Sequence, residues 1–362
     1  MIRAMHHNDG VPSTSSYAAA GVDTRAADSG VAALVEVLRS IDPGRPRLSL
    51  PLPGHYASVL EVAPGLGIAL ATDSVGSKVV VAEQCARFDT IGIDCVAMNV
   101  NDLICVGAEP LAVLDYVAVE QADPELLRGV ALGLRAGAEL AGVEIPGGEV
   151  CQLPEVIRGH PSPRGFDLVG SAIGRVALDR VLDGSLCRPG DALVGLPSSG
   201  VHSNGLTLAR QALLQDAGLS LADTPGALLG QSIADALLEP TTIYVRAILA
   251  LLGSEVPVHG LAHITGGGVL NLLRIGSGVG YEIAAPLAIP PIFELIAKAG
   301  AVPEREMWEV FNMGCGFCAI VPEAHADDAT ALLAGHHPGT RVIGALTDRA
   351  GVVSLPGLEL AG

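Results

Sequence analysis

The feature that most constrains this chain is a helical segment, residues 89–106, whose surface is apolar on nearly every side. Asp89 and Thr90 can cap its first turn, and Gly107 can end it. A helix that is apolar all round is stable only when other elements or lipid surround it. The chain contains no run of about 18 uninterrupted apolar residues, which argues against a membrane span. The segment therefore predicts a buried helix within a sizeable core.

Four polar residues interrupt this helix: Asp94, Asn99, Asn101 and Asp102. Asp94 shares one side of the helix with Asn101 and Asp102, because residues two turns apart lie on the same face. A buried carboxylate is costly unless it is paired or bound to a metal. Ion pairs with arginine are one reading. The whole chain has 21 lysines and arginines, so a metal ion is the favoured partner of Asp102.

Strand-like and helix-like segments alternate along the rest of the chain. Expected strands cover residues 59–62, 67–72, 111–119, 166–176, 192–196 and 313–321, and expected helices cover residues 29–40, 124–141, 203–217 and 240–252. Residues 179–191 carry turn residues and little apolar periodicity, so we place a domain boundary there. The prediction is an α+β protein with an N-terminal domain at residues 1–180 and a C-terminal domain at residues 181–362.

The formal net charge of −18 limits the partners of the protein. An acidic chain without a cluster of basic residues repels nucleic acid and anionic membranes, so we expect neither as a partner. A phosphorylated small molecule fits better, because backbone N–H groups and Mg²⁺ bind phosphate without a positively charged protein. The seven irregularly spaced cysteines indicate reduced thiols and a cytoplasmic location. For the lone CxxC pair, Cys315 and Cys318, packing within a strand is favoured over a redox or metal role.

The segment Thr72-Asp-Ser-Val-Gly-Ser-Lys78 combines a strand end, a glycine- and serine-rich turn, and a lysine. Asp73 is placed to hold Mg²⁺, and the N–H groups of the turn and Lys78 are placed to face phosphate. An ordinary turn with a capping aspartate is the alternative. Lys78 and Lys298 are the two lysines of the chain, and a compact ammonium at this turn suits a phosphate oxygen.

Three further segments contain glycine-rich or serine-rich turns. Pro146-Gly-Gly-Glu149 lets the backbone approach a ligand beside a carboxylate, although such turns are common. Ser198-Ser-Gly-Val-His-Ser-Asn-Gly205 and His263-Ile-Thr-Gly-Gly-Gly268 each open an expected helix, where free N–H groups suit an anion. His202 is a candidate for phosphate binding or proton transfer, and a solvated loop histidine is the alternative. Two phosphate-suited helix starts and acids fit for Mg²⁺ together indicate phosphoryl chemistry.

Taken together, these segments resemble the aminoimidazole ribonucleotide synthetase family, whose motifs occur here in the same order and at similar spacing. The matching segments are Tyr17-Ala-Ala-Ala-Gly-Val-Asp23, Thr72-Asp-Ser-Val-Gly-Ser-Lys78, Asp89-Thr-Ile-Gly-Ile-Asp94, Asn101-Asp-Leu103, Gly107-Ala-Glu-Pro110, Leu114-Asp-Tyr116, Gly147-Gly-Glu149, Ser198-Ser-Gly-Val-His-Ser-Asn-Gly205, Glu239-Pro-Thr241, His263-Ile-Thr-Gly-Gly-Gly268 and Phe311-Asn-Met-Gly314.

The resemblance implies a fold and a reaction. Members of the family are homodimers whose N-terminal domains form a shared β-barrel, with α/β C-terminal domains outside. The implied reaction converts formylglycinamidine ribonucleotide and ATP into aminoimidazole ribonucleotide, ADP and phosphate in purine biosynthesis. The amide oxygen attacks the γ-phosphate, and the amidine nitrogen of the substrate then displaces phosphate and closes the ring.

The resemblance also implies roles for individual residues. Mg²⁺ and phosphates would be held by Asp73, Asp102 and Glu149. ATP would be bound by Asp73, Ser74, Gly76, Ser77, Lys78, Asp94 and Asn101. The phosphorylated substrate would be bound by His202, Ser203, Asn204, Thr265, Gly266, Gly267 and Gly268. Catalysis would involve Lys78, Asp102 and His202.

Three positions depart from the family pattern. Leu50-Pro-Leu-Pro-Gly-His-Tyr56 stands where the family usually has a glycine-rich loop, Ser74 where it has glycine, and Gln152 where it has a carboxylate. These changes leave two alternatives open. One is a related ATP-dependent enzyme that phosphorylates another amide or a thio acid, and the other is a catalytically silent nucleotide-binding homologue.

Overall fold

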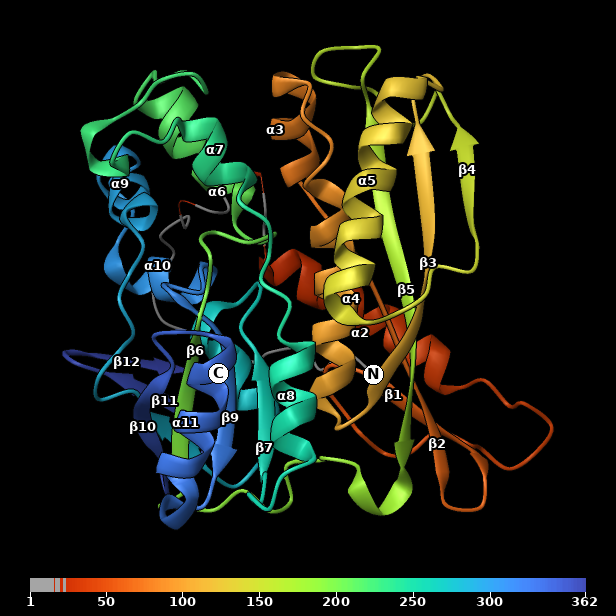
Figure 1. Cartoon of the computed structure of the whole chain (residues 1–362), viewed down its shortest axis with the longest axis vertical. Coiled ribbons are helices and arrows are strands. Elements are labelled where there is room, and N and C mark those ends of the chain that lie inside the picture. Colours follow the sequence, from red (N-terminus) through yellow and green to blue (C-terminus); the bar gives the residue numbers. More distant parts are fainter. Residues whose placement is uncertain (1–15, 17–19, 22–23) are drawn as a thin grey trace.

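The computed structural model describes residue 16, residues 20–21 and residues 24–362. The motif at residues 17–23 therefore lies mostly outside the described residues. Figure 1 shows two halves side by side, one holding strands β1–β5 and the other holding strands β6–β12. Within the described ranges, no helix is both long enough and apolar enough to cross a membrane.

The N-terminal half is built on a five-stranded sheet with the order β1-β2-β5-β3-β4. Strands β3 and β4 are parallel, and the other neighbouring pairs are antiparallel. The elements of this half are α2 (Thr24–Arg39), β1 (Ser58–Ala63), β2 (Leu66–Ser74), α3 (Lys78–Cys85), α4 (Ile91–Cys105), β3 (Glu109–Val119), α5 (Pro124–Ala141), β4 (Gly148–Gln152), β5 (Phe166–Ala177) and the short 3₁₀-helix η1 (Leu178–Arg180).

Helices α4 and α5 pack together, and α4 also packs on β2, β3 and β5 (Figure 1). Strand β5 alternates between buried and more exposed side chains, as expected of a strand with one covered face. The two helices meet at glycines: a Cβ on Gly92 would lie 2.0 Å from the backbone nitrogen of Leu134. Glycine therefore lets α4 and α5 approach to backbone contact.

The opposite face of the sheet exposes apolar side chains. Leu70, Leu114, Tyr116 and Ile173 are between 37% and 50% exposed. Leu70 pairs directly with Ile173 across the strands, and the other two lie in neighbouring rows that point the same way. This apolar sheet face is therefore a continuous surface feature of the N-terminal half.

The C-terminal half holds a seven-stranded sheet with the order β12-β11-β8-β10-β6-β9-β7. The neighbouring strands β6 and β9, which lie inside the sheet, are buried along nearly their whole length, as expected of strands covered on both faces. The elements of this half are β6 (Ala192–Pro197), α6 (Leu206–Arg210), the π-helix η2 (Gln211–Asp216), η3 (Gly226–Leu228), α7 (Ile233–Leu238), α8 (Val245–Leu252), β7 (Gly260–His263), η4 (Gly268–Arg274), β8 (Gly280–Glu282), α9 (Pro291–Ala299), α10 (Glu304–Val310), β9 (Cys315–Val321), η5 (Glu323–His325), α11 (Ala326–His336), β10 (Arg341–Thr347), β11 (Val352–Leu355) and β12 (Leu358–Ala361).

Helix α4 joins the two halves. It packs against β7 and α8 of the C-terminal half as well as against its own sheet, and α3 packs against α7. Nearly all of its residues are buried. The helix is apolar all round because protein surrounds it on all sides.

Two helices begin later than their sequences predict. The helix expected at residues 203–217 begins at Leu206 and continues as a π-helix from Gln211. The helix expected at residues 240–252 begins at Val245. Residues 239–244 are not helical because backbone groups of Glu239, Thr241 and Thr242 bind polar side chains of α3 and α4. Strand β4 was not expected, and it carries Glu149 at the edge of the sheet.

Candidate functional site

The turn after β2 brings polar residues to the junction between the two halves. Asp73 and Ser74 are the last residues of β2. Ser74 stays in the strand and pairs with β5, so its side chain requires no unusual backbone conformation. Gly76 adopts a φ of +70°, which glycine tolerates best. The hydroxyl of Ser77 lies 2.9 Å from that of Thr207 in the C-terminal half.

Lys78 is fully buried and points into the protein. Its Nζ donates to Asp94 Oδ1 at 2.9 Å and to the carbonyl oxygen of Glu239 at 2.6 Å. Burial lowers the pKa of Lys78, and the Asp94 carboxylate opposes that shift. Asp94 Oδ1 also accepts from the N–H and the hydroxyl of Thr241. The expected contacts of Lys78 and Asp94 with ATP are therefore not available in this arrangement, because each group neutralises the other inside the core.

Two further polar residues of α4 face the C-terminal half. Asn101 donates from Nδ2 to the carbonyl of Thr242 at 2.9 Å and accepts at Oδ1 from the N–H of Tyr244 at 3.0 Å. Asp102 Oδ1 lies 2.8 Å from His263 Nδ1, and the Asp102 side chain is 17% exposed. The amide of Asn101 is thus occupied by backbone partners, whereas Asp102 retains an accessible carboxylate.

The Asp102 carboxylate acts electrostatically on Asp73. Burial first, and the Asp102 carboxylate second, raise the pKa of Asp73 to about 6, while the Ser74 N–H, His263 and Arg274 oppose the rise. A divalent cation between two such carboxylates would remove their repulsion. Among the described residues, no group of three or more acidic, histidine or cysteine side chains is arranged to hold a metal ion. Mg²⁺ is commonly held by one or two carboxylates together with substrate phosphates, so the Asp73–Asp102 pair fits it.

Glu149 is not brought to this pair. In the sheet register, Glu149 on β4 lines up with Tyr116 on β3, which lines up through β5 with Ser74 on β2. Asp73 is one residue away from that row, so its side chain points to the opposite face. Three strand spacings, roughly 14 Å, also separate β4 from β2. The expected three-carboxylate set is therefore not assembled within one chain.

Asp115 is a carboxylate to which the sequence analysis assigns no role. Asp73 on β2 and Asp115 on β3 both pair with Gly170 of β5, so the two acids lie in one row on the face that α4 covers. Gly148 makes room for this side chain, since a Cβ there would lie 2.4 Å from Asp115 Oδ1. Burial raises the pKa of Asp115. The sequence feature that could have identified Asp115 is an acidic residue inside an otherwise apolar strand.

His202 is buried in the turn before α6, with a φ of +62°. Its Nε2 accepts from the N–H groups of Ser199 at 3.2 Å and Thr242 at 3.4 Å. Two donors on Nε2 select the tautomer with its proton on Nδ1, and Nδ1 is buried without a partner among the described residues. Burial first, then the charges of His263 and Lys78, lower the pKa of His202. The geometry therefore favours a neutral hydrogen-bond donor over a proton-accepting base.

The segments around His202 and the three glycines meet. A Cβ on Gly266 would lie 3.0 Å from Asn204 Oδ1. The Asn204 side chain therefore contacts residues 265–268, which we call the glycine segment. The buried hydroxyl of Ser203 lies 3.2 Å from that of Thr241. The structure thus places the expected substrate-binding residues of both segments beside each other.

Asn271 holds the glycine segment in its conformation. Its Nδ2 donates to the carbonyl oxygens of Gly266 at 3.1 Å and Gly268 at 2.8 Å, and its Oδ1 lies 3.5 Å from the Thr265 hydroxyl. Gly267 and Gly268 adopt φ values of +101° and +55°. The carbonyl groups turn toward Asn271, and within the described chain the N–H groups of Gly266 and Gly267 are left without a protein acceptor.

Arg274 and Tyr56 also lie at this junction, and neither was expected to have a role there. Arg274 is the last residue of η4, and its guanidinium carbon lies 5.0 Å from the ring centre of Tyr56. The Tyr56 hydroxyl donates to the carbonyl oxygen of Asn271 at 2.9 Å. The sequence feature that could have identified Arg274 is a basic residue in the helix that follows the three glycines.

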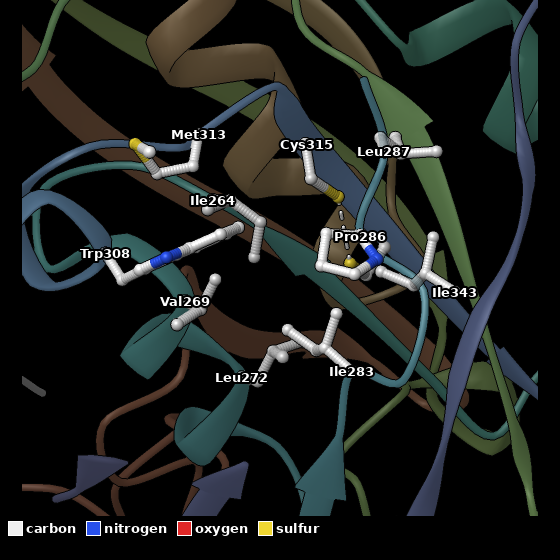
Figure 2. A pocket seen from close by; sticks show the side chains of 11 residues that line it. Ile264, Val269, Leu272, Ile283, Pro286, Leu287, Trp308, Met313, Cys315 and Ile343 are labelled. Carbon is white, nitrogen blue, oxygen red and sulfur yellow. Dashed lines mark hydrogen bonds between the residues drawn. The ribbon is translucent and has the colours of Figure 1, made fainter. Parts of the chain in front are cut away.

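The CxxC pair lies in the core of the C-terminal half. Figure 2 shows Cys315 beside a pocket that Trp308 and Ile283 also line. The cavity measures about 10 Å³, close to the smallest space that holds one water. The sulfur atoms of Cys315 and Cys318 lie 3.5 Å apart as free thiols. The hydrogen bond with Cys315 and then burial raise the pKa of Cys318, which supports packing over redox chemistry.

A larger groove of about 540 Å³ lies near the end of β5, where the chain crosses between the halves. Its walls include Arg180, Leu182 and Leu249. None of the residues that line it belongs to the site expected from the sequence. We therefore place the candidate site at the polar junction around α4 and not in this groove.

Comparisons with family models and with known proteins point to the same family. The family model for the N-terminal domain of AIR synthase related proteins matches residues 54–176. The model for their C-terminal domain matches residues 188–355. A phosphoribosylformylglycinamidine cyclo-ligase of Methanothermobacter thermautotrophicus is 48% identical over 304 residues, which are 83% of this chain and 86% of that protein. The protein of the same name from Thermococcus gammatolerans is 45% identical over 342 residues, 93% of this chain and 96% of that protein.

The fold also has solved counterparts. The crystal structure of hydrogenase maturation protein HypE in complex with ATP matches with a TM-score of 0.59 and 24% identity, over 81% of this chain and 84% of that chain. At this level of identity the likeness establishes the fold alone. The two-domain α+β architecture expected from the sequence is confirmed.

Proposed function

The chain belongs to the family of AIR synthase related proteins, and from this premise we propose that it is an ATP-dependent cyclo-ligase of purine biosynthesis. Its reaction converts formylglycinamidine ribonucleotide and ATP into aminoimidazole ribonucleotide, ADP and phosphate. The observation that carries this conclusion is 48% identity to a named cyclo-ligase over 83% of the chain. The site adds a chemical reason, because its paired carboxylates, free N–H groups and neutral histidine suit phosphoryl ligands.

Two bond changes make up the reaction. The formyl amide oxygen attacks the γ-phosphorus of ATP, so that an O–P bond forms while the bond to the ADP oxygen breaks. The amidine nitrogen then attacks the activated carbon, and phosphate leaves with the former amide oxygen. Loss of a proton completes the aromatic ring. Most of the work of a protein in such a reaction is positioning and charge stabilisation.

We propose Asp73 and Asp102 as the residues that hold Mg²⁺. The metal would supply charge neutralisation at the transferring phosphate. Asp73 is largely buried and electrostatically coupled to Asp102, which is the environment that a divalent cation stabilises. Glu149 is left out of this set because it points to the opposite face of the sheet.

The ligand-binding roles are divided between the two halves. The backbone N–H groups of Gly76 and Ser77 would contact ATP, because those of Ser74 and Val75 already donate within the protein. The glycine segment 265–268 with Asn204 would contact the phosphorylated substrate. His202 would donate from Nδ1 to an oxygen of the reacting groups, which its unpaired buried proton supports. Lys78 and Asp94 would act indirectly, by holding the turn after β2 against α4.

We further propose a homodimer in which the apolar sheet face of one protomer covers that of its partner. Four large apolar side chains on this face are at least 37% exposed, and such patches mark association surfaces. A domain division at residues 1–180 and 181–362 is supported by the two separate sheets. A cytoplasmic location is supported by the odd number and irregular spacing of the seven cysteines, which are typical of reduced thiols.

A direct assay tests the proposed reaction. The purified protein is mixed with ATP, Mg²⁺ and formylglycinamidine ribonucleotide, and aminoimidazole product and ADP are measured together. We expect equal amounts of both products, and loss of both in Asp73→Asn. ADP release with another amide or thio-acid substrate alone would favour a related enzyme. Binding of ATP without any turnover would favour a silent homologue, and either result would overturn the proposal.

A further inference from the structure

Arg274 is a cation whose hydrogen-bonding groups are unused. It is partly buried at the end of η4 and stacks at 5.0 Å over the ring of Tyr56. Among the residues that the structure describes, no hydrogen bond or ion pair engages its guanidinium. A guanidinium has five N–H donors, and removing them from water without acceptors is unfavourable. The position therefore favours a ligand that brings acceptors and negative charge.

Arg274 lies at the candidate site. It ends the helix that follows the glycine segment 265–268, and it adds to the fall in the pKa of His55 in the loop before β1. Its neighbour Tyr56 is hydrogen-bonded to Asn271, whose side chain holds the glycine segment. The guanidinium therefore lies at the same junction as the expected substrate-binding residues.

The other cation expected in the site is already neutralised. Lys78 is fully buried and paired with Asp94 at 2.9 Å. Bringing Lys78 to a phosphate would leave the Asp94 carboxylate buried without its counter-ion, which is strongly unfavourable. Arg274 is placed to add positive charge beside a phosphorylated ligand, in addition to the backbone N–H groups and the proposed Mg²⁺.

Tyr56 fixes the position of this cation. Its ring is buried beneath the guanidinium, and its hydroxyl donates to the carbonyl of Asn271, the residue whose side chain holds the glycine segment. An aromatic face attracts a guanidinium and restricts its orientation. Residues 50–56, which replace the glycine-rich loop usual in the family, thereby connect to the glycine segment of the C-terminal half.

We propose that Arg274 binds a phosphoryl group of ATP or of the phosphorylated substrate, and that Tyr56 is the residue that positions it. This inference rests on the proposed function, because that reaction supplies the phosphorylated ligands. It assigns to Arg274 the phosphate contact that the sequence led us to expect from Lys78.

Calorimetric titration tests the contact without requiring turnover. ATP with Mg²⁺ and formylglycinamidine ribonucleotide are each titrated into the wild type, Arg274→Gln and Arg274→Lys. We expect Arg274→Gln to weaken at least one ligand by about tenfold or more, and Arg274→Lys to recover part of the loss. Arg135→Gln is the matched control, because Arg135 is exposed and its one ion pair among the described residues is with Glu139. Its affinities should equal those of the wild type.

The outcomes separate this inference from the proposed function. Wild-type affinity for both ligands in Arg274→Gln would overturn the phosphate contact, whatever the wild-type turnover. A lower unfolding midpoint with equal losses in the Gln and Lys variants would indicate a structural role and also overturn it. Absence of turnover in a wild type that binds both ligands would defeat the proposed function alone, and absence of binding would defeat both.

Two substitutions test the positioning role of Tyr56. Tyr56→Phe keeps the ring and loses the hydroxyl, whereas Tyr56→Leu loses the ring. We expect Tyr56→Leu to raise KM for the ligand that Arg274 binds, with a smaller change in kcat, and Tyr56→Phe to stay close to the wild type. Equal effects of the two variants on KM would overturn the positioning role.

Discussion

The carboxylate of Asp73 lies in an environment that disfavours its ionisation. Burial and the neighbouring Asp102 raise its pKa from 3.8 to about 6 in the folded protein. Because the folded-state pKa is higher, the contribution of Asp73 to folding stability is complete below pH 3.8 and is lost as the pH rises through about 6. This difference in pKa corresponds to a loss of about 3 kcal/mol in folding stability.

This shift predicts how Asp73→Asn behaves. Without Mg²⁺, we expect the variant to unfold at a higher temperature than the wild type at pH 7, and to lose the fall in stability between pH 4 and pH 6. Added Mg²⁺ should stabilise the wild type and leave the variant nearly unchanged, because binding to the folded state adds stability. Thermal unfolding across pH, with and without the metal, measures both effects. Identical pH profiles for the two proteins would contradict the account.

Single residues were predictable where a polar side chain interrupts an apolar pattern. Asp73 and Asp102 stand out in this way, and the Asp102 carboxylate contributes to the raised pKa of Asp73. The burial of Lys78 was not predictable, because its partners include the Glu239 carbonyl, 161 residues away along the chain. Arg274 was missed for a related reason, since its neighbour Tyr56 comes from the other half of the molecule.

At the scale of elements, the Lys78–Asp94 pair connects α3 to α4 and to the extended residues 239–244. Lys78→Met would leave Asp94 buried without a counter-ion. We expect a loss of about 3–5 kcal/mol in the free energy of unfolding, measured by denaturant titration. A second change, Asp94→Asn, should recover part of that loss because it removes the unpaired charge.

Lys298 provides the control for this experiment. It is the other lysine of the chain, and its ion pair with Glu294 is exposed. Lys298→Met should change stability by less than about 0.5 kcal/mol, as exposed ion pairs usually do. Equal effects of the two lysine substitutions would refute a structural role for the buried pair.

The glycine segment makes a prediction of its own, because its glycines are not equivalent. A Cβ on Gly268 would lie 1.9 Å from the Trp308 carbonyl oxygen, whereas a Cβ on Gly266 would lie 3.0 Å from the end of the Asn204 side chain. We expect Gly268→Ala to lower stability by about 3 kcal/mol or more, and Gly266→Ala to fold with a change below about 1 kcal/mol. Gly266→Ala should instead raise KM for the substrate. Similar stability of the two variants would contradict this model of the segment.

Element types followed from periodicity more reliably than element boundaries did. The helix at residues 89–106 was predictable because a helix that is apolar on all sides must be buried on all sides. The start of α8 at Val245 was not, because residues 239–244 exchange helical hydrogen bonds for contacts with α4. Strand β4 is short and lies mostly exposed at an edge, so it has no apolar pattern to reveal it.

At the scale of the whole molecule, the apolar sheet face predicts the oligomeric state. We expect the wild type to be a dimer in light-scattering measurements, and Leu114→Asp combined with Tyr116→Glu to be a folded monomer. Both residues lie on the exposed face. Leu140→Asp is the control, since Leu140 is 52% exposed on α5 and away from that face. A monomeric wild type, or a dimeric double variant, would refute the proposed interface.

The overall architecture was predictable from the alternation of strand and helix patterns, while the assembly of the site was not. Segments from residue 73 to residue 274 converge on α4, and their meeting depends on how two sheets pack around one helix. Glu149 illustrates the limit, because one residue of strand register places it on the opposite face from Asp73. Pattern and spacing identify candidate residues, and only the packed fold determines which of them meet.

In the proposed reaction, ATP phosphorylates the amide oxygen of the substrate, and this oxygen leaves the ring carbon as part of phosphate. The most direct measurement uses formylglycinamidine ribonucleotide labelled with oxygen-18 at the formyl group, with mass analysis of the released phosphate. We expect one labelled oxygen in each phosphate, in equal amount to the aminoimidazole product. Ring formation accompanied by unlabelled phosphate would contradict it.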